Sequence, residues 1–203
     1  ADLVVWTGIG ARTSESQTHR EMASGLSMPV GFKNSTDGSI APAVNAMSAA
    51  QYPHRFLGID GEGQVSIVST TGNPDCHLVL RGGANTPNYD AESVAIATTV
   101  LKQANLCTRV MVDCSHGNTQ KDFRRQSLAL SNVAAQIRAG NSPLIGVMIE
   151  SNLVAGKQSF PAPRHQLVYG QSITDACVDF PTTLAMLREL AATRTHALAT
   201  VNS

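Results

Sequence analysis

The sequence has no surplus of charge, few aromatic residues and no long apolar run. Its 15 lysines and arginines match 15 aspartates and glutamates, and the cationic residues are spread along the chain, so we expect no continuous surface for nucleic acid. No apolar stretch approaches the roughly 20 residues that cross a bilayer, and the amino terminus has no basic region followed by an apolar one. The sequence therefore predicts no nucleic-acid partner and no membrane association. Any recognition of phosphate must be local.

Cysteine is scarce as well. The four cysteines show no C-x-x-C spacing, and a chain of 203 residues with so few of them is unlike a disulfide scaffold. The pattern predicts reduced thiols in a cytoplasmic protein. An apolar fraction of 42% is ordinary for a globular protein, and the length suffices for one domain with a sizeable core.

Apolar runs alternate with helical stretches along most of the chain. Runs that have the composition of buried strands lie at residues 3–9, 29–32, 77–80, 110–112 and 144–149. Stretches typical of helices lie at residues 14–25, 39–50, 91–103 and from 118 to about 140. This order predicts βα units and a parallel sheet, and hence the α/β class.

Two further segments complete the expected organisation. Residues 56–58 and 64–70 alternate around a turn rich in aspartate and glycine, which predicts a small hairpin outside the main sheet. Asp179-Phe180-Pro181 opens a last helix, because proline is tolerated in the first helical turn. We expect a frayed tail at residues 193–203.

Each strand-like run is followed by a side chain that can bind an anion or a metal. These side chains are Arg12, Lys33, Arg81, His116 and Glu150. When parallel strands close into a barrel, their carboxyl ends face one mouth, and catalytic groups collect there from distant segments. The pattern therefore favours a barrel with a single site.

The three cations among them also have simpler interpretations. Arg12 follows small residues that let an anion approach the backbone, and its guanidinium can grip phosphate or carboxylate, but it could instead pair with Glu15 or Glu21. Lys33 is either a phosphate-binding or acid-base group or a solvated surface lysine. The glycine pair after Arg81 either admits a ligand or serves a turn that needs positive φ.

The run that leads to His116 carries more information. Alternation places Val110, Val112, Cys114 and His116 on one face, with His116 nearest the mouth if that face points into the barrel. A lone histidine is usually structural, and we interpret Cys114, one layer below, as structural too.

A metal would account for the polar groups at this end of the chain. Glu150 ends an apolar run, where an unpaired carboxylate is costly to bury, and Asp175 offers a further ligand from the next segment. Together with His116, these groups suit a borderline divalent ion such as Mn, Fe, Co or Zn, with open positions for substrate.

Six ordered segments give the chain a more specific resemblance. They are GARTSESQ (10–17), PVGFKN (29–34), LRGG (80–83), DCSHGN (113–118), GVMIES (146–151) and YGQSITDAC (169–177). From Ala1 to about Ala192 the chain resembles the C-terminal part of class I 3-deoxy-D-arabino-heptulosonate 7-phosphate (DAHP) synthase. The resemblance implies a TIM (β/α)₈ barrel, present here as about five βα units plus the hairpin.

The resemblance also implies a reaction. The family condenses phosphoenolpyruvate with erythrose 4-phosphate, the first step of the shikimate pathway towards aromatic amino acids. Ala11, Arg12, Lys33 and Arg81 match the residues that hold the phosphate and carboxylate of phosphoenolpyruvate. His116, Glu150 and Asp175 match the ligands of the divalent metal. The resemblance thus implies that Lys33 and His116 are the catalytic residues.

Part of the family pattern is missing. A complete barrel has eight strands and about 250 residues, whereas five convincing barrel strands are found here. The family's cysteine metal ligand, a further lysine and arginine, and the Lys-Pro-Arg-Thr-Ser stretch for the sugar phosphate have no match. Because the chain begins almost directly in a strand at Ala1, we expect it to be a fragment that is inactive alone; a processed amino terminus is the other interpretation.

Regulation and assembly follow the resemblance as well. Ser27 and Gly58 match the region where relatives bind an aromatic amino acid as feedback inhibitor, and the residues around Gly58 are more similar to tyrosine-sensitive members. Since the family forms dimers and tetramers, the hairpin could instead pack against a neighbouring subunit of a homo-oligomer.

Two other functions remain open at this point. One is the related 3-deoxy-octulosonate 8-phosphate synthase, which also condenses phosphoenolpyruvate with a sugar phosphate. The other is a non-catalytic subunit that senses an aromatic amino acid or completes the barrel of a partner.

Overall fold

Five parallel strands form the central sheet of the computed structural model, which describes residues 3–140 and 143–201. They are β1 (Thr7–Ile9), β2 (Val30–Lys33), β5 (Cys76–Leu80), β6 (Val110–Asp113) and β7 (Leu144–Met148). The strand order is β1-β2-β5-β6-β7, and every neighbouring pair is parallel. The predicted α/β class and the five predicted strands are confirmed, and the sheet is a partial barrel.

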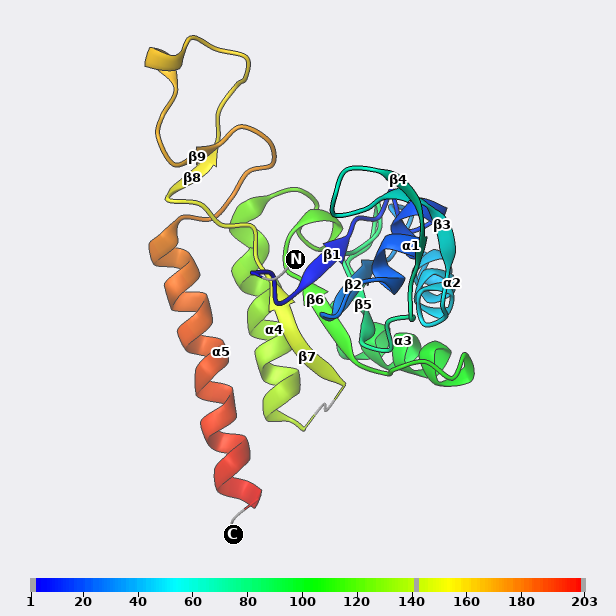
Figure 1. Cartoon of the computed structure of the whole chain (residues 1–203). Helices are drawn as coiled ribbons and strands as arrows, with labels where there is room; N and C mark the ends of the chain where they lie inside the picture. The colour runs from blue at the N-terminus through cyan, green and yellow to red at the C-terminus, as the bar shows by residue number, and fades with distance from the viewer. Residues whose placement is uncertain (1–2, 141–142, 202–203) are drawn as a thin grey trace.

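Helices flank this sheet (Figure 1). They are α1 (Gln17–Ser24), α2 (Ala41–Ala50), α3 (Ala91–Gln103), α4 (Gln126–Arg138) and α5 (Phe180–Val201). Helix α5 lies alongside α4, and Ser131 Oγ donates to Glu189 Oε2 across 3.0 Å between them. Helix α5 extends to Val201 and so includes most of the segment for which we expect a frayed tail, and that fraying stays a prediction. Residues 202–203 lie outside the described part of the chain.

The two faces of the strands have different surroundings. Side chains that point to the helices make up the core, and the largest are Val30, Phe32, Leu78, Leu80, Val110 and Val112. Cys114 is fully buried in the same cluster, which confirms its structural interpretation. The expectation that Val110, Val112 and Cys114 face the interior of the barrel is wrong, because these side chains pack against the helix layer.

The other face of the sheet lines the concave interior. Trp6 Nε1 donates to His77 Nε2 across 2.8 Å, and both side chains lie over Gly31. A Cβ atom at Gly31 would come within 2.6 Å of Val79 and 2.8 Å of Trp6. This face therefore needs a residue without a side chain in the middle of β2.

The predicted hairpin is present. Strands β3 (Arg55–Ile59) and β4 (Val65–Ser69) pair antiparallel outside the central sheet. Its base is tied to the end of α1 by the hydroxyls of Ser24 and Thr70, 2.8 Å apart. One face of the hairpin is apolar and exposed, through Leu57, Ile59, Val65 and Ile67.

The long helix predicted from residue 118 is broken. The short 3-10 helices η1 (His116–Thr119) and η2 (Phe123–Arg125) precede α4. Between them, Gln120 and Lys121 have φ angles of 53° and 65°, which a right-handed helix does not admit. The sequence gives no sign of this turn, because residues 118–140 have the composition of a helix throughout.

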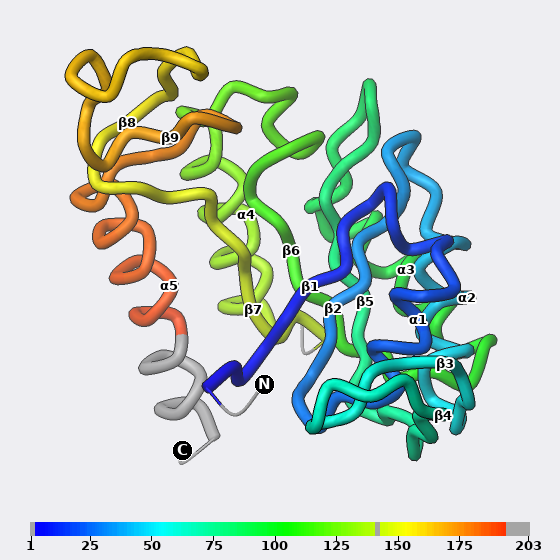
Figure 2. The backbone as a smooth tube through the Cα atoms, turned by 45° about the horizontal axis from the view of Figure 1, so that its top comes forward, coloured from blue at the N-terminus to red at the C-terminus, as the bar shows by residue number. Residues whose placement is uncertain are grey.

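An arm that the sequence did not predict follows β7. Strands β8 (Val154–Lys157) and β9 (Gln171–Ser172) form a small parallel sheet, with the 3-10 helix η3 (Arg164–Gln166) between them. The arm lies beyond the carboxyl end of β7, away from α1 to α3 (Figures 1 and 2). It leads the chain back to Asp175 before α5 begins.

The close packing over Gly31 gives a testable prediction. Gly31→Ala should lower the free energy of unfolding by about 1–3 kcal/mol, because the new methyl group overpacks the interior, and it should shift the emission of Trp6, the only tryptophan. Thermal melting and fluorescence measure both effects. Gly61→Ala is the control, since a Cβ there meets nothing within 4 Å. Equal melting temperatures for the two variants would contradict this account of the interior.

Candidate active site and metal centre

A cavity of about 330 Å³ opens at the carboxyl ends of the central strands. Its lining includes Ala11, Arg12, Lys33 and Arg81, together with His116 and Asp175. Segments as distant in sequence as residues 11 and 175 thus meet at one mouth. The structure thus brings together, in one cavity, all four residues predicted to bind phosphoenolpyruvate and two of the three predicted metal ligands.

Strand alternation aims three charged side chains into the mouth. Gly31 and Val79 face the interior, so Lys33 and Arg81, two residues further on, continue the same face. Met111 lines the interior beside Trp6 and His77, and Asp113 continues that face of β6. His116 arrives differently, from the turn after β6.

The loop that carries Arg12 is tied to the end of β2. The buried hydroxyl of Ser14 lies 3.2 Å from the carbonyl oxygen of Gly10 and 2.9 Å from that of Lys33. In the part of the chain that the structure describes, Arg12 forms no ion pair with Glu15 or Glu21. Its exposed guanidinium is thus available to an anion.

The segment around Arg81 is held by asparagine side chains. Asn34 Oδ1 accepts from the Arg81 amide across 2.7 Å, and Asn88 Oδ1 accepts from the Gly82 amide across 2.7 Å. Gly82 has a φ of +78°, and a Cβ there would lie 2.4 Å from the Asn118 nitrogen. The turn after β5 therefore requires a glycine at this position, and the same turn directs Arg81 towards the cavity.

The guanidinium of Arg81 is half-buried. Burial lowers its pKa, and the positive charge of Arg12 acts in the same direction, while Asp113 opposes the shift. Because the ordinary pKa of arginine lies far above neutral, the group stays charged at neutral pH. Two guanidinium groups that line one cavity, one of them partly desolvated, can together attract a multiply charged anion.

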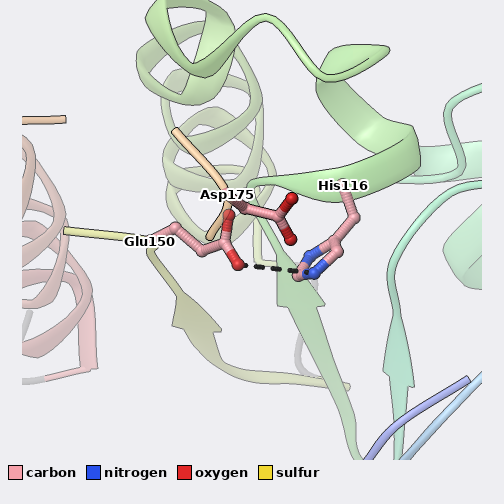
Figure 3. A group of neighbouring side chains, drawn as sticks. All are labelled: His116, Glu150 and Asp175. Atoms are coloured by element: carbon pink, nitrogen blue, oxygen red, sulfur yellow. Dashed lines mark ion pairs between the residues drawn. The ribbon is translucent and has the colours of Figure 1, made fainter. Parts of the chain in front are cut away.

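The three predicted metal ligands converge beside this cavity (Figure 3). Ligand atoms of His116, Glu150 and Asp175 all lie within 4.8 Å of one another. His116 Nε2 is 3.4 Å from Glu150 Oε1. One imidazole nitrogen and two carboxylates form a donor set that suits a borderline divalent ion.

Glu150 is placed by its neighbours. Gln126, the first residue of α4, donates from Nε2 to the Glu150 carbonyl across 3.0 Å and accepts from the Glu150 amide across 2.9 Å. Ser115 Oγ donates to Glu150 Oε2 across 2.8 Å. The carboxylate is therefore fixed before any ligand binds, whereas Asp175 is exposed on the loop after β9.

Asp113 lies between the cations that line the cavity and the His116-Glu150-Asp175 cluster. Its fully buried carboxylate is 2.8 Å from Lys33 Nζ and 2.8 Å from His116 Nδ1. The ring N–H of His116 is not aligned for a straight hydrogen bond with this oxygen. Burial opposes ionisation of Asp113, but the contacts with His116 and Lys33 outweigh it and hold its pKa below the ordinary value.

The sequence singled out His116 but missed Asp113. The sequence analysis followed the even-numbered residues of β6, whereas the odd-numbered residues Met111 and Asp113 are the ones that face the interior.

The two residues predicted for an effector site lie on different elements. Ser27 is exposed in the segment between α1 and β2. Gly58 is in β3, where a Cβ would come within 2.6 Å of Val68. The space above Gly58 is thus filled by a side chain of the hairpin itself, and the assignment of an effector site stays a prediction.

Within the described residues, no helix is long and apolar enough to cross a membrane.

Comparison with known proteins gives one consistent result. The family model described as "DAHP synthetase I family" matches residues 1–188. The chain is 58% identical over 189 residues to the Tyr-sensitive phospho-2-dehydro-3-deoxyheptonate aldolase of Escherichia coli K12, covering 93% of this chain and 53% of that protein. It is 52% identical over 191 residues to the Phe-sensitive protein of that strain, covering 94% of this chain and 54% of that protein.

A solved structure agrees. The phospho-2-dehydro-3-deoxyheptonate aldolase of Francisella tularensis superimposes with a TM-score of 0.91 at 49% identity, covering 96% of this chain and 56% of that one. The chain therefore spans about half the length of each of these three relatives.

The buried thiols give a prediction for the folded state. Burial raises the pKa of Cys76 to about 12 and also raises that of Cys114, so neither thiol ionises near neutral pH. Since the thiolate is the reactive form, a thiol reagent should modify the partly exposed Cys107 first and reach the other two only on unfolding. Peptide mapping by mass spectrometry measures the order. Rapid native modification of Cys114 would contradict its burial behind β6.

Proposed function

This chain belongs to the DAHP synthetase I family, and we propose that it forms the phosphoenolpyruvate-binding and metal-binding half of a DAHP synthase. The reaction joins phosphoenolpyruvate, erythrose 4-phosphate and water to give 3-deoxy-D-arabino-heptulosonate 7-phosphate and phosphate. The observation that carries this proposal is the meeting of three cations and a His-Glu-Asp cluster in one mouth.

The cations suit the first substrate. Phosphoenolpyruvate carries a phosphate and a carboxylate, and Arg12 and Arg81 can grip either group through paired N–H donors. Lys33 adds a point charge from the end of β2. The small side chain of Ala11 leaves the backbone beside the cavity open to the ligand. These four residues form the proposed substrate site.

The His-Glu-Asp cluster fits a divalent metal. His116 turns Nε2 towards Glu150, its other ring nitrogen is buried without a well-aligned hydrogen bond, and Asp175 supplies a second carboxylate. Mn, Fe, Co or Zn accepts this mixture of nitrogen and oxygen donors. When bound, the metal would polarise the aldehyde of the second substrate.

The residues of the chain then have distinct tasks. Arg12 and Arg81 hold the phosphate and carboxylate and offset their charge while phosphate leaves. Lys33 lies where its ammonium can donate a proton within the cavity. In the reaction, C3 of phosphoenolpyruvate attacks the aldehyde carbon, water adds at C2, and cleavage of the C–O bond releases phosphate.

We propose that groups for the sugar phosphate come from outside these residues. A closed barrel has eight strands, and the described central sheet has five. The cysteine ligand and the Lys-Pro-Arg-Thr-Ser stretch that the resemblance implies are absent from the sequence. This chain therefore supplies part of the catalytic centre.

Regulation, assembly and location complete the proposal. The Tyr-sensitive name of the E. coli relative favours tyrosine as an effector, in the region of Ser27 and Gly58. The exposed apolar face of the hairpin suits a contact within a homo-oligomer. The proposed location is the cytoplasm, where cysteines are kept as reduced thiols.

The activity itself is the first test. The complete protein that contains this sequence, given Mn²⁺ and both substrates, should release phosphate and form the heptulosonate product, because the mouth then holds every reacting group. Coupled phosphate release and mass spectrometry of the product measure this. Arabinose 5-phosphate should be a poor substitute for erythrose 4-phosphate. The 203-residue chain alone should show no turnover, and sustained turnover by it would contradict the proposal of a shared centre.

The role of Arg81 can be tested separately. Arg81→Gln should raise the KM for phosphoenolpyruvate at least about tenfold, since a charge-assisted pair contributes roughly 1.5–3 kcal/mol, while the melting temperature changes little. Steady-state kinetics of the complete protein provide the measurement. Arg188→Gln is the matched control, because Arg188 is exposed on α5. An unchanged KM in Arg81→Gln would remove this residue from the substrate site.

A further inference from the structure

One carboxylate oxygen touches both halves of the mouth. Asp113 Oδ2 lies 2.8 Å from Lys33 Nζ and 2.8 Å from His116 Nδ1. Lys33 belongs to the proposed phosphoenolpyruvate site and His116 to the proposed metal site. Asp113 belongs to neither set, yet its side chain is wholly buried between them.

The carboxylate of Asp113 is itself held in place. Its Oδ1 accepts from the Ser115 amide across 2.8 Å, and its carbonyl oxygen accepts from Asn118 Nδ2 across 2.7 Å. The strand position is fixed by the pairing of Asp113 with Met148 of β7. A group held by both its backbone and its second oxygen can orient its neighbours without moving itself.

Both neighbours need an orienting contact. The lysine side chain ends in a compact charge on a flexible four-carbon stem, so without a partner Lys33 would sample many directions. The ring of His116 turns Nε2 towards Glu150, and the Asp113 carboxylate lies 2.8 Å from the opposite nitrogen, Nδ1. This contact restricts the ring even though the N–H is not aligned for a straight hydrogen bond, and a carboxylate at this place makes a histidine a better metal ligand. Asp113 meets both needs at once.

We propose that Asp113 is a positioning residue that sets Lys33 for phosphoenolpyruvate and His116 for the divalent metal, and so fixes the two halves of the site relative to each other. This inference rests on the proposed function. It adds a residue that holds two binding groups and contacts neither ligand itself.

Charge alone makes the opposite prediction for one ligand. Asp113 places a negative charge beside a cavity for an anion, so its neutralisation would strengthen phosphoenolpyruvate binding if only long-range charge mattered. Positioning predicts weaker binding, because Lys33 loses its direction. The sign of the change therefore separates the two roles.

The test is Asp113→Asn in the complete protein that contains this sequence. Mn²⁺ binding, followed by the electron paramagnetic resonance signal of the free ion, should weaken about 10- to 100-fold. Phosphoenolpyruvate binding, measured by calorimetry, should weaken about tenfold, as expected for loss of a charge-assisted contact. Wild-type affinity for either ligand, or tighter phosphoenolpyruvate binding, would overturn the two-sided role.

Asp90→Asn is the matched control. Asp90 caps α3 by accepting from the Ser93 amide, and asparagine caps a helix equally well. This variant removes a carboxylate outside the mouth, so it should keep both affinities. Equal losses in the Asp90 and Asp113 variants would overturn a specific role for Asp113.

A second pair of variants covers the case in which Asp113→Asn does not fold. Lys33→Met/Asp113→Asn removes both members of the buried ion pair and leaves neither charge uncompensated. It is compared with Lys33→Met alone, in which Asp113 still faces His116. Mn²⁺ should bind at least about tenfold more weakly to the double variant, and equal affinities would overturn the proposal.

Failure of the proposed function gives a different result. If the complete wild-type protein binds Mn²⁺ no better than a His116→Ala variant, the metal site itself is refuted and the inference falls with it. If the wild type binds Mn²⁺ through His116 and Asp113→Asn binds equally well, only the role of Asp113 is refuted.

Discussion

The site depends on the parallel register of the central strands. In β2, β5 and β6, every second side chain faces the interior, and the last of these on or just beyond each strand are Lys33, Arg81 and Asp113. Lys33 pairs with Val79, and Leu80 pairs with Val112, so the three strand ends lie at neighbouring levels. A slip of one residue would turn these charged groups into the apolar helix layer, so the same core packing that fixes the register also assembles the mouth.

Buried polar contacts then convert strand position into side-chain direction. Asn118 donates to the carbonyl oxygens of Leu80 and Asp113, across 3.1 and 2.7 Å, and thereby joins the ends of β5 and β6. The side chain of Gln126 likewise holds the backbone of Glu150, since it donates to the Glu150 carbonyl and accepts from the Glu150 amide. Networks of this kind are favourable only when fully satisfied. Hydrogen bonds therefore hold the polar groups at the ends of β5 to β7, whereas Asp175 lies on an exposed loop.

The sequence predicted what regular periodicity encodes. All five central strands and the hairpin were found, because buried runs and alternation leave clear patterns. Periodicity failed after β6, since the left-handed residues Gln120 and Lys121 break a stretch of helical composition. It also assigned His116 to a strand face, although His116 has a φ of 51° and enters from a turn. Asp113 was overlooked because both faces of β6 end in polar groups, and only the structure shows which face turns inward.

The proposed chemistry needs an anion and a metal in adjacent halves of one mouth. The most direct test is a crystal structure of the complete protein with Mn²⁺ and phosphoenolpyruvate, with data collected at the manganese absorption edge. We expect one anomalous peak between His116, Glu150 and Asp175, with the phosphate and carboxylate of the substrate on Arg12, Lys33 and Arg81. A manganese peak elsewhere, or phosphoenolpyruvate bound away from these cations, would contradict this expectation.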